Sequence, residues 1–81
     1  MIEITTKLGP REAIDKVVEN LMNEYISFNV TFFQDYIAIE TDILSIQFRR
    51  FDGENHLYVK GNQKDLTIYD FNKLYKIIRG V

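Results

Sequence analysis

The alternation of apolar and polar residues between Phe28 and Lys60 constrains the fold of this 81-residue chain more than any other feature. Apolar residues recur there at every second position, which is typical of an antiparallel sheet with one face buried and the other in water. Short polar pairs that favour tight turns interrupt the alternation, and we expect hairpins at Gln34-Asp35, Thr41-Asp42 and Gly53-Glu54. The stretch therefore predicts a four-stranded antiparallel meander.

These turns predict the register between neighbouring strands. Counting outward from them gives the apolar pairs Phe32 with Ile37, Val30 with Ile39, Ile39 with Leu44, Ile37 with Ile46 and Phe48 with Val59. A shift by one residue would move every apolar side chain to the other face, so the agreement of all the turns on one face supports the arrangement. Arg50 falls opposite Leu57, where we expect its aliphatic stem to lie on apolar surface and its charge to stay in water.

The opposite face of the predicted sheet, called the open face below, combines polar residues with large aromatic ones. It carries Asn29, Thr31, Phe33, Tyr36, Ala38, Ser45, Gln47, Arg49, Phe51, His56, Tyr58 and Lys60. In the predicted register Arg49 lies opposite Tyr58, and Phe51 lies opposite His56. Aromatic residues where water is expected are the feature that folding alone does not explain. The candidate partner-binding residues are Phe33, Tyr36, Arg49, Phe51, Tyr58 and Lys60.

Two amphipathic helices are predicted to bracket the meander. Gly9-Pro10 is a helix start, and the apolar stripe of the first helix comprises Ala13, Ile14, Val17, Val18, Leu21, Met22 and Tyr25, with Asn20 on the polar side. In the second helix, expected from Ile68 to Arg79, Thr67 caps the amide of Asp70 and Leu66 packs on Phe71. Its apolar stripe comprises Phe71, Leu74, Tyr75 and Ile78, and Gly80 suits a left-handed end.

These elements predict a single α+β domain spanning residues 1–81. The expected architecture is a two-layer sandwich, in which a four-stranded antiparallel meander carries two helices on one face. The alternation of Met1 to Thr6 adds a short fifth strand at an edge, so the expected order is (β)-α-β-β-β-β-α.

Composition limits the function classes. The chain is too apolar for disorder, at 46% hydrophobic residues, and has no long uncharged run that would span a membrane. Its N-terminus does not resemble a secretory signal, and the absence of cysteine is compatible with a reducing compartment, so we expect a cytoplasmic protein. A net charge of −2 argues against broad attraction to phosphate backbones or anionic lipid.

Residue patterns that carry catalysis or bind cofactors are missing. His56 is the sole imidazole, and neither Ser27 nor Ser45 lies in a nucleophile motif. The glycines are scattered, which excludes a phosphate-binding loop, and the carboxylates near the turns lack the spacing of a calcium loop. We therefore expect no enzyme activity, no cofactor and no metal.

The open face then suggests a binding function. An apolar centre with a polar rim is typical of a protein interface, so we expect an inhibitor or regulator that docks on or occludes a partner protein. Two alternatives use the same face: aromatic and basic residues that bind nucleic acid, or a structural homodimer. In a third interpretation the aromatic residues only stabilise the sheet.

Overall fold

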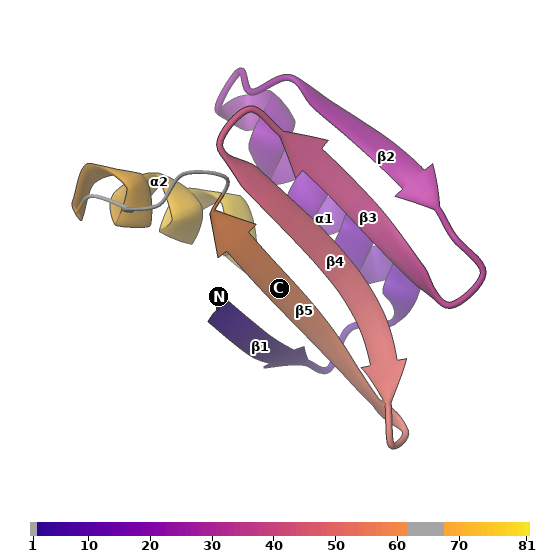
Figure 1. Ribbon diagram of the computed structural model, residues 1–81. Helices are drawn as coiled ribbons and strands as arrows, with labels where there is room; N and C mark the ends of the chain where they lie inside the picture. The colour runs from indigo at the N-terminus through magenta and orange to yellow at the C-terminus, as the bar shows by residue number, and fades with distance from the viewer. Residues whose placement is uncertain (1, 62–67) are drawn as a thin grey trace.

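The computed structural model describes residues 2–61 and 68–81, with side chains in the second helix from residue 72 onward. Its elements, in chain order, are β1 (Ile2–Thr6), α1 (Pro10–Asn23), β2 (Phe28–Phe32), β3 (Tyr36–Thr41), β4 (Leu44–Phe51), β5 (Glu54–Gly61) and α2 (Ile68–Ile78). The strands form one antiparallel sheet in the order β1-β5-β4-β3-β2. Figure 1 shows α1 crossing behind β3 and β4. The predicted α+β architecture is confirmed, including the N-terminal edge strand.

The predicted register is correct for β2 and β3. Phe32 lies opposite Ile37 and Val30 lies opposite Ile39. The amide of Phe33 donates to the carbonyl of Tyr36 at 2.9 Å, which closes the hairpin around the predicted turn.

The turn between β3 and β4 lies one residue later than predicted. Glu40 pairs with Ser45, so Ile39 faces Ile46 and not Leu44. The hydroxyl of buried Thr41 accepts a hydrogen bond from the amide of Leu44 at 2.9 Å and donates to its carbonyl at 3.2 Å. Thr41 is therefore a structural residue of this turn.

The turn between β4 and β5 lies one residue earlier than predicted. Asp52 and Gly53 both have positive φ, 51° and 77°, which is the backbone of a type I′ hairpin. Consequently Arg49 lies opposite His56, while Phe51 lies opposite Glu54, and both predicted partners were wrong. Each error moves the register by two residues, so every side chain keeps its predicted face.

The core lies between the sheet and the two helices. It comprises Ala13, Ile14, Val17, Leu21, Ile39, Leu44, Ile46, Phe48, Leu57, Val59, Leu74 and Ile77. Two residues predicted for the apolar stripe of α1, Met22 and Tyr25, are exposed instead. Asn20 was expected on the polar side but is buried, because α2 packs over it and both Ile77 and Arg79 accept hydrogen bonds from its amide.

The described part of α2 also differs from its prediction. The helix ends at Ile78, one residue early, and Ile77 is buried in place of Tyr75, which is exposed. Gly80 has φ of 81°, as the predicted left-handed end requires. The predicted cap by Thr67, with Leu66, lies outside the described residues, as do the side chains of Asp70 and Phe71.

Candidate functional site

Three predicted site residues form a compact stack on the open face. The rings of Phe33 and Tyr36 are nearly parallel, at 17°, with centroids 4.6 Å apart. Arg49, which lies opposite Tyr36 on β4, places its guanidinium carbon 4.0 Å from the centre of the Tyr36 ring. Its Nε also donates to the side-chain oxygen of Gln47 at 3.0 Å. These contacts fix a layered unit, which we call the aromatic stack: Phe33, Tyr36 and Arg49.

The aromatic stack leaves different residues accessible. The Tyr36 ring has Phe33 and Arg49 as stacking neighbours and is half-buried, as is Arg49. Phe33 is 49% exposed and ends the stack. Because these side chains are already ordered by one another, a partner that binds them would immobilise few additional rotamers. The stack is therefore an ordered surface unit with Phe33 as its exposed end.

A second group of polar side chains lies on β1 and β5. The Nδ1 atom of His56 is 2.9 Å from a carboxylate oxygen of Glu3, and its Nε2 atom is 3.5 Å from Glu54. His56 is buried, although its place on the open face predicted a residue in contact with water. Its ring stacks on Tyr58 with centroids 6.1 Å apart. Partial desolvation raises the pKa of Tyr58, and the nearby carboxylate of Glu3, which accepts its hydroxyl hydrogen bond, raises it further.

The remaining predicted site residues lie at opposite ends of the open face. Phe51 is exposed next to the Asp52-Gly53 turn, whereas Lys60 pairs with Ser45 at the far end of the same hairpin. Six residues along β4 separate these positions, which corresponds to roughly 20 Å. The six predicted residues therefore do not form a single compact pocket. Three belong to the aromatic stack, Tyr58 belongs to the group around His56, and Phe51 and Lys60 lie apart at the two ends of the face.

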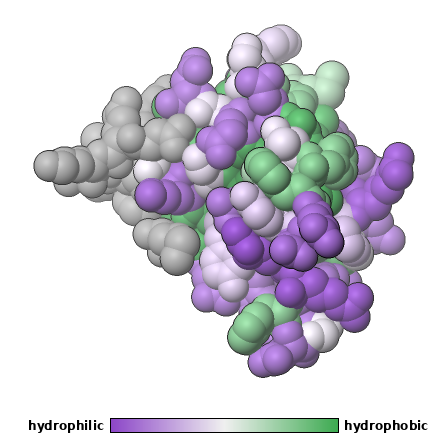
Figure 2. Space-filling view, turned by 45° about the vertical axis from the view of Figure 1, so that its right-hand side comes forward, coloured by the Kyte–Doolittle hydropathy of each residue, from purple (hydrophilic) through white to green (hydrophobic). Residues whose placement is uncertain are grey.

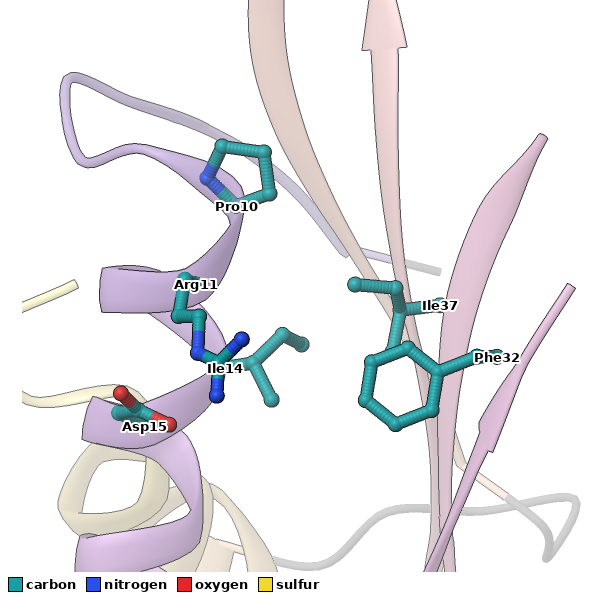
Figure 3. A pocket seen from close by; sticks show the side chains of 6 residues that line it. All are labelled: Pro10, Arg11, Ile14, Asp15, Phe32 and Ile37. Carbon is teal, nitrogen blue, oxygen red and sulfur yellow. The ribbon is translucent and has the colours of Figure 1, made fainter. Parts of the chain in front are cut away.

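An apolar groove that the sequence did not predict lies on the helix side of the sheet. The groove has a volume of about 290 Å³ and is lined by Pro10, Arg11, Ile14, Asp15, Phe32 and Ile37. Figure 3 shows Ile14 on α1 facing Phe32 and Ile37 across it. Phe32 was predicted to be a core residue, and its side chain is on the predicted face but remains 73% exposed. The alternation placed Phe32 on the correct face but carried no signal for the groove, because it does not show how far the helices extend over the sheet.

Neither a metal-binding cluster nor a membrane-spanning helix is found among the described residues. Among the described side chains, no three His, Cys, Asp or Glu residues lie close enough to hold a metal ion. Neither helix, over its described length, is long and apolar enough to cross a bilayer. Comparisons find no match to the chain among protein-family models, curated proteins or solved structures.

Proposed function

We propose that this chain is a non-catalytic protein-binding module of the cytoplasm, which inhibits or regulates a partner protein by docking through its open face. The observation that carries this proposal is the aromatic stack. The exposed ring of Phe33 stacks on the Tyr36 ring with centroids 4.6 Å apart, and the guanidinium carbon of Arg49 lies 4.0 Å from the centre of the Tyr36 ring. Aromatic residues and arginine are enriched among the interface residues that contribute most to affinity.

Charge on the open face favours a protein over a nucleic acid. Arg49 and Lys60 are accompanied there by carboxylates, and those of Glu3 and Glu54 lie on either side of His56. The base-stacking surface of Tyr36 is occupied on one side by Arg49 and on the other by Phe33. Nucleic acid binding needs an excess of positive charge beside its stacking rings, and the described residues of this face offer little of it.

The test compares two exposed aromatic residues on different surfaces. Partners are captured from source-cell lysate on tagged protein, with and without nuclease, and the affinity of each captured protein is then measured with purified components. Phe33→Ala should weaken binding at least about tenfold, a loss of about 1.4 kcal/mol. Tyr75→Ala, which changes an exposed aromatic residue on α2, is the matched control and should leave affinity unchanged.

Two results would contradict the proposal. Equal affinity of the Phe33→Ala and Tyr75→Ala variants would exclude the aromatic stack as the binding surface. Capture that disappears on nuclease treatment, with an affinity that falls steeply as salt rises, would establish nucleic acid as the ligand.

A further inference from the structure

Strand β2 forms an edge of the sheet that lacks the usual protection against pairing. It pairs only with β3 in the part of the chain that the structure describes, and Figure 1 shows it at the outer border of the sheet. Its sequence, Phe28 to Phe32, contains no charge, proline or glycine. Natural edge strands commonly carry such residues because a free edge recruits other strands. The other edge strand, β1, does carry a charge at Glu3.

The backbone groups available on this edge belong to alternate residues. The amide of Phe33 donates to Tyr36, so this pair is a hydrogen-bonded one. Bonded and non-bonded pairs alternate along an antiparallel ladder. Asn29 and Thr31 therefore direct their amides and carbonyls toward β3, whereas Phe28, Val30 and Phe32 direct theirs outward. The side chains of these three outward residues lie on the helix side of the sheet, where Phe28 and Val30 pack against the core.

Exposed apolar side chains flank both ends of this edge. Phe32 borders the groove at the end of β2, opposite Ile14 (Figure 3). At the start of β2, the chain arrives from Met22 and Tyr25, which are 63% and 96% exposed. Figure 2, turned toward this side, shows apolar patches among the hydrophilic residues. Tyr25 also has φ of 56°, a conformation that costs energy for a residue with a side chain. Glycine would be the residue favoured at this position if only the stability of the fold mattered.

We propose that β2 pairs antiparallel with β2 of a second copy of this chain, with the two Val30 residues facing each other across a twofold axis. In this register Phe28 lies opposite Phe32 of the partner subunit, and about six backbone hydrogen bonds form between the outward groups. The strand is self-complementary, because apolar residues meet apolar residues at every outward position and no charges are opposed. A single sheet then runs through both subunits.

The same pairing brings the start of β2 in one subunit next to the end of β2 in the other. Because the strands are antiparallel, the end of one subunit with Met22 and Tyr25 approaches Phe32 of the partner subunit. Each groove, which Phe32 borders, then lies beside the exposed apolar end of the other subunit. The interface is short, so the dimer is reversible and forms as concentration rises. It goes beyond the proposed function, since it leaves both open faces free on one side of the joined sheet.

The mass in solution tests the dimer directly. Sedimentation equilibrium of the wild-type chain should show a rise from 9.6 kDa toward twice that value with concentration. Phe32→Lys introduces a charge at the edge and should abolish the rise, while Phe51→Lys, an equally drastic change at an exposed position of the open face, should not. A wild-type mass of 9.6 kDa at all concentrations would overturn the proposal.

A cysteine trap tests the register, because the chain contains no cysteine of its own. Val30→Cys brings two sulfurs to directly opposed positions about 5.5 Å apart between Cα atoms, within disulfide range. Thr31→Cys is the matched control, because its partner-subunit counterpart lies diagonally at about 7–8 Å. Mild oxidation should crosslink the Val30→Cys variant at least tenfold faster. Equal rates would refute the proposed pairing, and either failure leaves the test of Phe33 unaffected.

Discussion

Asn20 joins the two helices, and its replacement should weaken the fold more than any other single polar change in α1. Its side-chain amide donates to the carbonyl of Ile77 at 2.8 Å and to that of Arg79 at 2.9 Å. Both carbonyls lie at the C-terminal end of α2, where backbone acceptors have no partner within the helix. Asn20→Ala removes both bonds, and Asn20→Asp replaces the donor with a negative charge at the negative end of the helix dipole.

The magnitude follows from two hydrogen bonds, one buried and one partly buried. Each contributes about 1 kcal/mol, so Asn20→Ala should lower the free energy of unfolding by about 2 kcal/mol. A domain of this length has a total stability of roughly 4 to 12 kcal/mol. Asn20→Asp should cost about 3 to 5 kcal/mol at neutral pH, because a buried carboxylate then faces two carbonyl oxygens. Asn23→Asp makes the same chemical change at an exposed position of α1 and should cost less than about 0.5 kcal/mol.

Urea unfolding followed by circular dichroism measures these differences. With a slope of about 1 kcal/mol per molar urea, Asn20→Ala should lower the midpoint by about 2 M. The two carbonyls raise the folded-state pKa of the carboxyl introduced by Asn20→Asp. The part of the penalty that comes from the charge is therefore present at neutral pH and should disappear as the pH falls below about 4. An Asn20→Asp variant that unfolds at the same urea concentration as Asn23→Asp would refute the bridging role of Asn20.

Three further changes test individual features of the fold. Tyr25→Gly should raise the free energy of unfolding by about 1 kcal/mol, and with it the urea midpoint, because it relieves a positive φ at a side chain that is almost fully exposed. A lower midpoint would mean that Tyr25 makes a stabilising contact. Thr41→Val should cost about 1 to 3 kcal/mol by leaving the amide of Leu44 unpaired, and Thr41→Ser should recover much of the loss in the same assay. Because the folded-state pKa of Tyr58 is raised, its hydroxyl stabilises the fold below about pH 10, and this stabilisation is lost above that pH. The wild type and Tyr58→Phe should therefore converge in stability as the pH rises through that range. A constant difference would exclude the hydrogen bond to Glu3 as the cause.

The faces of the sheet could be predicted because they depend only on alternation. The errors at two turns each moved the register by two residues. Arg49, for example, lies opposite His56 and not opposite the predicted Tyr58, but no side chain moved to the other face. The turn at Asp52-Gly53 was readable, since this dipeptide is a strong signal for a type I′ hairpin. Thr41 was less readable, because its role depends on a hydroxyl that replaces backbone bonding within the turn.

Other parts of the site depend on which surfaces the helices reach, and periodicity does not contain this information. The pattern of α1 assigns Asn20 to the polar side, and only the packing of α2 makes that side interior. Likewise the pattern of β2 places Phe32 on the core face but does not say whether a helix covers that part of the face. Local patterns determine the direction in which a side chain points, whereas its burial depends on the neighbouring element.

The exposure of Phe32 follows from where the two helices lie on the sheet. The fifth strand, β1, joins the sheet beside β5, on the side opposite β2. Since α1 and α2 remain in contact through Asn20, they cannot spread to cover both borders of the widened sheet. The helix layer therefore covers the start of β2, where Phe28 and Val30 pack against the core, but leaves Phe32 exposed at its end. Within the described residues the same strand also has an unpaired backbone edge.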